Sequence, residues 1–104
     1  MLNVTFHGVR GSAPAPGAGT QRYGGNTSCV ALEAPAQEPL LLDLGTGARA
    51  WAATLGGRPL RARALLTHVH FDHVQGLPFL EASTPPAPAW RCGAPIPRAG
   101  DWLT

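Results

Sequence analysis

The sequence predicts an α/β fold, in the broad sense that includes α+β, and three observations carry this prediction. Several short apolar segments are bounded by glycine or proline, which is typical of strands. One stretch of helical length starts after Gly-Thr-Gly and stops at two glycines. A long glycine-rich stretch separates the first two strands. The 104 residues allow one small domain with a modest core, and they contain neither an internal repeat nor a second domain.

Three strands are predicted in the N-terminal part of the chain. Residues 2–7 alternate apolar and polar side chains with a period of two, so one face of this strand is expected to be buried. Residues 27–33 form the second predicted strand. After a proline-containing turn, residues 40–44 are an almost unbroken run of leucines, which fits a strand covered on both faces.

The next elements are a helix, a strand and a second helical segment. The helix is predicted over residues 48–55, where Gly56 and Gly57 end it. Residues 63–67 form another predicted strand. A helix is then predicted over residues 74–82 in spite of an internal proline.

The first loop and the C-terminal segment stand apart from these elements. Residues 8–26 are too long and too rich in glycine for a simple turn, and such a loop within a compact domain is usually functional. A flexible surface loop is the alternative. We expect residues 1–82 to form a partial domain and residues 83–104 to be an irregular tail, since that tail is rich in proline and shows no periodicity.

Composition excludes several classes of protein. No apolar run approaches the ~20 residues that a bilayer-spanning helix needs. The N-terminus lacks the basic and apolar regions of a secretory signal. Cys29 and Cys92 are too few for a disulfide framework and fit free thiols in a reducing cytoplasm. The net charge of +2 comes from scattered arginines, which is weak evidence for a nucleic-acid partner.

The strongest chemical signal is a cluster of histidines directly after the predicted strand at residues 63–67. His68, His70 and Asp72 alternate along the chain and project to one side of an extended segment, whereas His73 points differently. Imidazole together with carboxylate suits zinc and similar ions. The pattern predicts two neighbouring metal ions, one held by His68 and His70 and the other by Asp72 and His73. A polar surface turn is the alternative.

Other motifs carry less weight. Residues 45–50 fit a loose G-x-G-x-x-A dinucleotide pattern, but residues 65–69 lack the acidic side chain that would bind a ribose. The glycine-rich loop has no Walker A lysine. Cys29 has no basic neighbour in the sequence and is expected to be a small buried strand residue. Trp51 is expected to pack the helix against the sheet.

Four motifs together resemble a known family. Residues 8–16 read GVRGSAPAP, residues 22–29 read RYGGNTSC, residues 42–47 read LDLGTG, and residues 67–78 read THVHFDHVQGLP. Their order and spacing resemble the metallo-β-lactamase superfamily, and within it the phosphodiesterase branch that includes tRNase Z. The resemblance extends from residue 4 to about residue 80.

The resemblance implies the N-terminal half of the metallo-β-lactamase αβ/βα sandwich, truncated. It implies metal ligands at His68, His70, Asp72 and His73, and a catalytic role for Asp72 because this residue holds the second ion. Asp43 would lie beneath the turn and brace it. Losing such a carboxylate often costs ~10–100-fold in metal affinity or activity. Capping of the following helix is the alternative for Asp43.

The implied chemistry is hydrolysis that depends on two metal ions. Zinc is the expected metal, with manganese and iron as alternatives, and the substrate is a phosphodiester, either a small molecule or RNA. Two ions ~3.5–4 Å apart lower the pKa of bound water to ~7 and hold the attacking and leaving oxygens. A non-catalytic metal-binding or interaction module is the rival interpretation. A hydrolase of another branch, similar to thioesterases or lactamases, is the third.

The family needs three further ligands: a histidine, a bridging acid and another histidine. No histidine follows His73, and the later acids Glu81 and Asp101 are given no ligand role. We therefore expect a truncated and inactive fragment. Its partner would be the missing C-terminal half or a second copy of the chain, since half of a two-sheet fold leaves an apolar sheet face exposed. No membrane association is expected.

Overall fold

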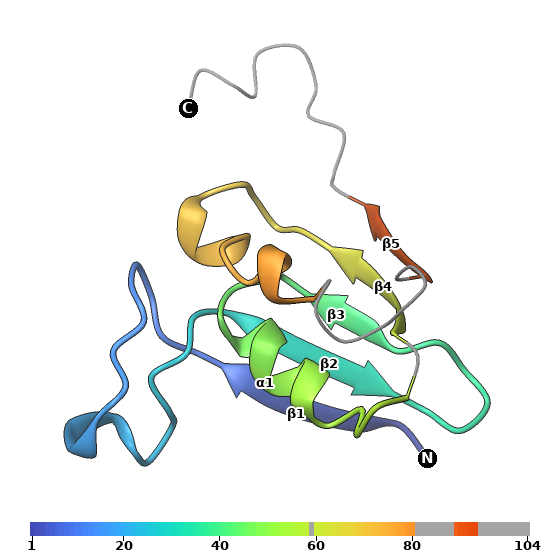
Figure 1. Ribbon diagram of the computed structural model, residues 1–104, viewed down its shortest axis with the longest axis horizontal. Helices are drawn as coiled ribbons and strands as arrows, with labels where there is room; N and C mark the ends of the chain where they lie inside the picture. Colours follow the sequence, from blue (N-terminus) through green and yellow to red (C-terminus); the bar gives the residue numbers. More distant parts are fainter. Residues whose placement is uncertain (59, 81–88, 94–104) are drawn as a thin grey trace, which may run out of the picture.

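A computed structural model describes residues 1–58, 60–80 and 89–93 (Figure 1). Strands (β), one α-helix and short 3-10 turns (η) follow one another along the chain. The elements are β1 (Asn3–Gly8), η1 (Ala18–Thr20), β2 (Cys29–Glu33), β3 (Leu40–Leu42), α1 (Gly47–Ala53), β4 (Arg61–Leu65), η2 (Phe71–His73), η3 (Leu77–Phe79) and β5 (Ala89–Gly93).

The strands form a five-stranded mixed sheet in the order β1-β2-β3-β4-β5. β1 pairs antiparallel with β2, and β2 antiparallel with β3, whereas β3, β4 and β5 run parallel. The connection from β3 to β4 passes through α1, which lies over one face of the sheet (Figure 1). Because β3 and β4 are parallel, the segments that follow them emerge at the same edge of the sheet. The predicted α/β class is confirmed.

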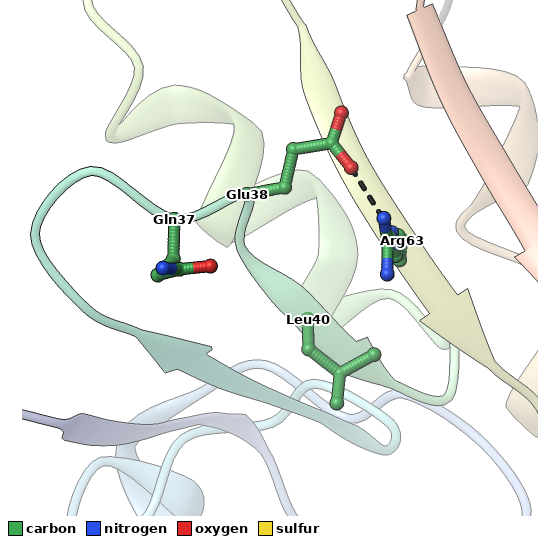
Figure 2. Close-up of a pocket in the computed structure, with 4 residues that line it drawn as sticks. All are labelled: Gln37, Glu38, Leu40 and Arg63. Carbon is green, nitrogen blue, oxygen red and sulfur yellow. Dashed lines mark hydrogen bonds and ion pairs between the residues drawn. The ribbon is translucent and has the colours of Figure 1, made fainter.

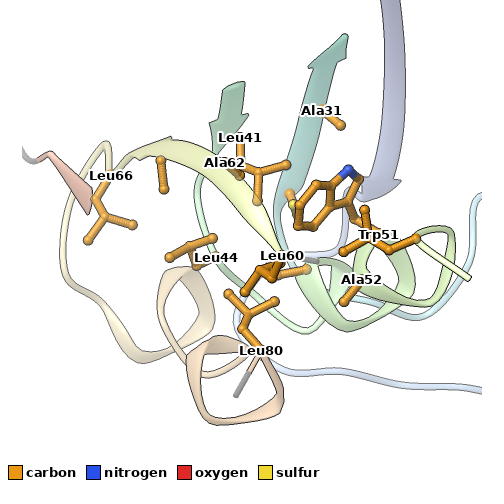
Figure 3. Close-up of a cluster of buried hydrophobic side chains, with 13 residues drawn as sticks. Ala31, Leu41, Leu44, Trp51, Ala52, Leu60, Ala62, Leu66 and Leu80 are labelled. Carbon is orange, nitrogen blue, oxygen red and sulfur yellow. The ribbon is translucent and has the colours of Figure 1, made fainter. Parts of the chain in front are cut away.

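The core lies between the sheet and α1 (Figure 3). Small and apolar side chains from alternate strand positions, such as Ala31 and Leu41, meet the fully buried ring of Trp51. The indole of Trp51 donates a hydrogen bond to Glu33 Oε1 at 2.7 Å, so the polar end of the ring is also satisfied. Trp51 therefore packs the helix against the sheet, as predicted from the sequence.

Cys29 is completely buried in this core. Burial raises the pKa of its thiol to about 12, and the nearby charge of Asp43 acts in the same direction. The thiol is therefore protonated at neutral pH and cannot act as a nucleophile. This agrees with the prediction of a small buried strand residue.

The sheet face opposite α1 is open among the described residues, and here the expectation for residues 2–7 is wrong. Val4 and Phe6 carry the apolar face of β1, yet their side chains are 51% and 68% exposed. The registers of the strands place further apolar side chains on the same face. We call this the open face, formed by Val4, Phe6, Val30, Leu32, Leu40, Leu42 and Leu65.

β3 is correspondingly covered on one side. Leu41 is buried, whereas Leu40 on the open face is half-buried, so the expectation of a strand covered on both faces is wrong as well. A shallow cavity of about 350 Å³ lies beside Leu40 and is lined by Gln37, Glu38 and Arg63 (Figure 2). An ion pair of 3.1 Å joins Arg63 to Glu38 across it.

Two elements differ from the sequence prediction for local reasons. β3 ends at Leu42 because Asp43 has φ 65°, in the left-handed region that terminates a strand. The described part of residues 74–82 forms a turn and one 3-10 helix, η3, instead of an α-helix. Pro78 lacks the amide hydrogen that an α-helical ladder requires.

The C-terminal segment contains a strand that the sequence did not indicate. β5 lies within residues 83–104, which we expected to be irregular, and it pairs in parallel with β4. Glu81, Asp101 and the remainder of that tail lie outside the described residues, as does the Cys92 side chain. Within the described ranges, no helix has the length and apolar character needed to cross a membrane.

The open face leads to a prediction about solution state. An uncovered apolar sheet face favours association, so the chain should elute as a dimer or larger species in size-exclusion chromatography. Phe6→Ser should shift the population towards the monomer. Phe79→Ser is the matched control, since Phe79 is 46% exposed but lies in η3, away from this face. A wild-type chain that is monomeric at all concentrations and melts cooperatively would contradict the prediction.

Candidate metal centre

Residues 68–76, which we call the histidine turn, lie at the sheet edge where β3 and β4 end, and backbone hydrogen bonds hold them there. The amide of Asp43 donates to Leu65 O at 2.9 Å, which continues the β3–β4 pairing by one step. The amide of Leu44 donates to His73 O at 2.8 Å, and Gly76 N donates to Leu44 O at 2.9 Å. The turn is therefore fixed on both sides of Leu44, the buried residue that follows Asp43.

This contact is possible because glycine occupies two positions where backbones touch. A Cβ on Gly76 would overlap the carbonyl of Gly45. A Cβ on Gly45 would overlap both the carbonyl oxygen of Asp72 and the hydroxyl of Thr27. Any side chain at these positions would push the histidine turn away from the sheet edge.

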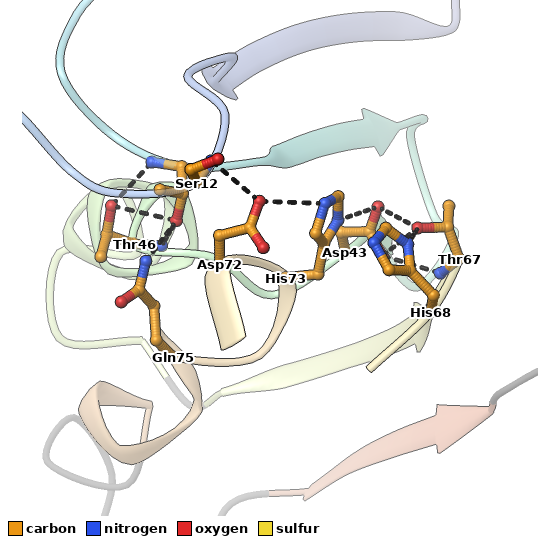
Figure 4. A network of polar contacts seen from close by, with 9 residues as sticks. Ser12, Asp43, Thr46, Thr67, His68, Asp72, His73 and Gln75 are labelled. Carbon is orange, nitrogen blue, oxygen red and sulfur yellow. Dashed lines mark hydrogen bonds and ion pairs between the residues drawn. The ribbon is translucent and has the colours of Figure 1, made fainter. Parts of the chain in front are cut away.

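Asp43 lies directly beneath the turn. It is 4% exposed, and its left-handed backbone is one that aspartate tolerates better than most residues. Its carboxylate accepts the amide of Thr67 at 2.7 Å and the hydroxyl of Thr67 at 2.9 Å (Figure 4). The alternative of a helix cap is not supported, because the N-cap residue of α1 is Thr46.

The two hydrogen bonds of the Thr67 hydroxyl, to Asp43 and to His68, indicate which ring nitrogen of His68 carries the hydrogen. An ionised carboxylate can only accept, so the single hydroxyl hydrogen of Thr67 points to Asp43. The hydroxyl oxygen lies 2.9 Å from His68 Nδ1 and must then accept a hydrogen from it. This assignment follows from the network, as tautomers generally do. It leaves Nε2 of His68, which is exposed, with the lone pair that a metal ligand needs.

His73 lies between two carboxylates. Its Nε2 atom is 3.2 Å from Asp72 Oδ2, and its Nδ1 atom is 3.0 Å from Asp43 Oδ2. The second distance is that of an ion pair, but the ring is not aligned for a hydrogen bond, and Nδ1 is buried with no hydrogen-bond partner among the described residues. The Asp43 carboxylate lies against the ring nitrogen that faces away from Asp72.

The donor atoms of the turn have the chemistry and spacing of metal ligands, but only in pairs. Two ligands on one tetrahedral zinc lie roughly 3.3 Å apart, close to the separation of His73 Nε2 and Asp72 Oδ2. The His68 ring lies 4.6 Å from that of His70 and 4.0 Å from that of His73, measured between centroids. Among the described residues, no three His, Cys, Asp or Glu side chains converge on one ion position.

The glycine-rich loop also reaches this site. The amide of Ser12 donates a hydrogen bond to Asp72 Oδ2 at 3.2 Å (Figure 4). Arg10 forms a β-bridge with Thr27, and the Thr27 hydroxyl accepts a hydrogen bond from Gln75 in the turn at 3.0 Å. The loop and the turn are therefore joined at two points, so at least these parts of the loop are held in place.

The Gly-Thr-Gly sequence at residues 45–47 has a structural role, in which Thr46 bonds to Thr27 and the glycines allow close packing. Its hydroxyl accepts the amide of Thr27, and its own amide donates to the Thr27 hydroxyl, both at 2.8 Å. Gly47 packs against the backbone at Gly8. Since packing and internal hydrogen bonds use this segment, it offers no open cradle for the phosphates of a dinucleotide.

The four site residues predicted within the histidine turn and Asp43 all lie at one edge of the sheet. Three further contacts at this edge were not predicted. Thr67 could have been suspected from its place directly before His68 and after a strand. Ser12 contacts Asp72 through its backbone amide, and Gln75 contacts Thr27, which is distant in the sequence. No local sequence pattern indicates either contact.

Residues 22–91 match the family model of the metallo-beta-lactamase superfamily. The chain belongs to the metallo-beta-lactamase superfamily. It is 33% identical to ribonuclease Z of Methanothermobacter thermautotrophicus and 37% identical to ribonuclease Z of Natronomonas pharaonis, each over 79 residues. These matches cover 75% and 76% of the chain but 23% of each relative, so the chain spans about a quarter of their length.

No solved structure matches the chain significantly. The metallo-beta-lactamase match begins at Arg22 and runs into β5, so it includes Asp43 and the whole histidine turn. The resemblance inferred from the sequence motifs is therefore confirmed at the level of the superfamily. The part of the loop that contains Ser12 precedes the matched segment.

The glycine contacts give a prediction about stability. Gly76→Ala should lower the free energy of unfolding by about 1–3 kcal/mol, because the added methyl group meets backbone that cannot move aside. Gly19→Ala is the control: a Cβ there meets nothing within 4 Å, so the change should stay within about 0.5 kcal/mol. Urea denaturation measures both. Equal stability of the two variants would show that the turn is not packed as described.

Proposed function

We propose that this chain forms part of a metal-dependent hydrolase that cleaves phosphodiesters. The observation that carries the proposal is the pairing of Asp72 and His73, whose donor atoms lie 3.2 Å apart beside the exposed ring of His68. Membership of the metallo-beta-lactamase superfamily and the match to two proteins named ribonuclease Z support this proposal.

In this proposal His68 and His70 hold one metal ion, and Asp72 and His73 hold the other. Zinc is the metal that imidazole and carboxylate ligands favour, with manganese and iron as alternatives. When bound, a pair of such ions activates water and neutralises the charge that develops on the phosphoryl group. The second ion has only two protein ligands in this proposal, the Asp72 carboxylate and the His73 imidazole. Loss of Asp72 should therefore reduce binding of that ion, and hence activity, the most.

The remaining residues of the centre position these ligands. Asp43 lies against His73 Nδ1 and, through the Thr67 hydroxyl, selects the tautomer of His68. Ser12 holds an oxygen of Asp72 through its amide. Orientation of ligands by a second set of contacts commonly changes metal affinity by ~10–100-fold.

The substrate proposed is a phosphodiester, either RNA or a small molecule. The two relatives carry the name ribonuclease Z, which favours RNA. We propose a cytoplasmic location for the protein. The 104 residues by themselves are proposed to be inactive, because the described residues give each ion two protein ligands where catalytic zinc usually has three.

A non-catalytic module is the second candidate function. The finding that favours it is the absence of any three-ligand cluster among the described residues, together with an open apolar face suited to a partner. Such a module would bind zinc or a protein without turning over a phosphodiester.

An experiment on metal content and turnover separates the two candidates. The 104-residue chain should hold less than two zinc ions after dialysis, and His68→Ala with His70→Ala should reduce the bound zinc further, whereas His7→Ala should not. It should not release nitrophenol from bis-nitrophenyl phosphate. A chimera that adds the C-terminal part of a ribonuclease Z relative should gain chelator-sensitive turnover and lose it on Asp72→Ala.

Two outcomes would count against the proposal. Chelator-sensitive turnover by the 104 residues alone would refute the incomplete centre. A folded, zinc-loaded chimera without phosphodiesterase activity would favour the non-catalytic module.

A further inference from the structure

A second cavity, distinct from the one beside Leu40, lies along the glycine-rich loop and is open to solvent. It has a volume of about 240 Å³, and we call it the loop cavity. Its principal lining side chains are Val9, Arg10, Thr20, Arg22 and Tyr23. The volume is below the ~300–1,000 Å³ of clefts that hold drug-sized molecules, which suits one planar group. Anionic groups joined to it would lie against the two arginines.

The walls of the loop cavity are fixed by the loop itself. The amide of Arg10 donates to Asn26 O at 3.0 Å, and the amide of Ala15 donates to Gly25 O at 2.8 Å. The hydroxyl of Thr20 donates to the carbonyl of Ala15. Gly25 allows this closure, because a Cβ there would overlap the backbone of Ala15. The cavity is therefore built in advance of any ligand.

The chemistry of the lining is cationic and aromatic. Residues 8–26 contain two arginines and no acidic residue. The guanidinium carbon of Arg22 lies 5.3 Å from the centre of the Tyr23 ring, yet Tyr23 remains 71% exposed. Within the described residues Arg10 uses only Nε, which donates to Ala13 O at 3.0 Å. The terminal nitrogens of both guanidinium groups remain able to donate to an anion.

The loop that lines the cavity also contacts the candidate metal centre. Ser12, whose amide contacts Asp72 Oδ2, follows Arg10 by two residues, so their Cα atoms are within roughly 7 Å. On the other side, Arg10 is tied to Thr27, which contacts Gln75 of the histidine turn. The loop that lines the cavity is therefore joined to the candidate metal centre on both sides of Arg10.

We propose that the loop cavity is a nucleotide subsite, in which Tyr23 stacks on a base and Arg10 and Arg22 bind the adjoining phosphates. The ligand class is a single-stranded nucleic acid. Exposed aromatic rings and arginines that follow the backbone are the features by which proteins bind single strands without reading sequence. The role beside a scissile phosphate rests on the proposed function, but binding in the cavity needs no metal ion.

The test is fluorescence anisotropy with labelled ten-nucleotide strands and the 104-residue chain, with EDTA present throughout. Tyr23→Ala should weaken binding about tenfold, while Tyr23→Phe should keep it, since stacking contributes ~1–3 kcal/mol per base. Arg10→Ala and Arg22→Ala should each reduce the slope of log affinity against log salt by about 0.7. Measuring RNA and DNA oligonucleotides of the same sequence side by side shows whether the sugar contributes to affinity. Stacking and phosphate contacts alone would give both the same affinity.

Arg49 and Phe79 supply a matched control. They form the same kind of contact, with the guanidinium carbon 5.2 Å from the ring centre, but they lie on α1 and η3. Arg49→Ala and Phe79→Ala should leave strand binding unchanged. Circular dichroism of each variant verifies that it is folded before its affinity is compared.

Two results would overturn the inference. One is equal strand affinity in folded wild-type and Tyr23→Ala proteins. The other is an acidic peptide that binds as tightly as RNA and with the same sensitivity to the three loop variants, which would make the cavity a peptide site. Because EDTA removes metal ions, a negative result in this binding test says nothing about the metal centre. Conversely, a chimera that binds strands through Tyr23 but lacks turnover would refute only the proposed hydrolysis.

Discussion

Asp43 places a carboxylate in a nearly closed environment and accepts both the amide and the hydroxyl of Thr67. A buried charge is costly unless it is well paired, so these contacts are what makes the position tolerable. The same carboxylate lies against His73 Nδ1. The Thr67 hydroxyl, which donates to Asp43, also contacts His68 Nδ1. One buried group at the end of β3 thus contacts His73 directly and His68 through Thr67, in a turn that follows β4. The rest of the candidate centre depends on that link.

Backbone packing makes this link possible. Gly45 and Gly76 allow the turn to approach the segment after β3, and the amide of Leu44 holds the turn there through His73 O. The glycine-rich loop then closes over the third side, where Ser12 meets Asp72. Three segments that are distant in the sequence therefore meet at one sheet edge. The opposite sheet face has no such cover among the described residues, which fits a chain that spans about a quarter of its relatives' length.

The sequence predicted the parts of this arrangement that depend on local patterns. Alternation and leucine runs located β1, β2 and β3, and the spacing of histidines located the turn. The family resemblance predicted an exposed apolar sheet face, but the strand pattern did not show that Phe6 lies on it. Such a pattern tells which side chains share a face but not which face a helix will cover. The 3-10 helix η3 after His73 reflects Pro78 within an otherwise helical pattern. The relay through Thr67 depends on a parallel register between strands separated by α1, which no sequence window contains.

The contact between the Asp43 carboxylate and the Thr67 hydroxyl links the end of β3 to the histidine turn, and a double-mutant cycle tests it most directly. The free energy of unfolding is measured for wild type, Asp43→Asn, Thr67→Val and the double variant, because these changes remove the contact with little change in shape. A hydrogen bond to a charged group contributes about 1.5–3 kcal/mol, so we expect a coupling energy of at least about 1 kcal/mol. Effects that add to within about 0.5 kcal/mol would contradict the claim that Asp43 holds the histidine turn through Thr67.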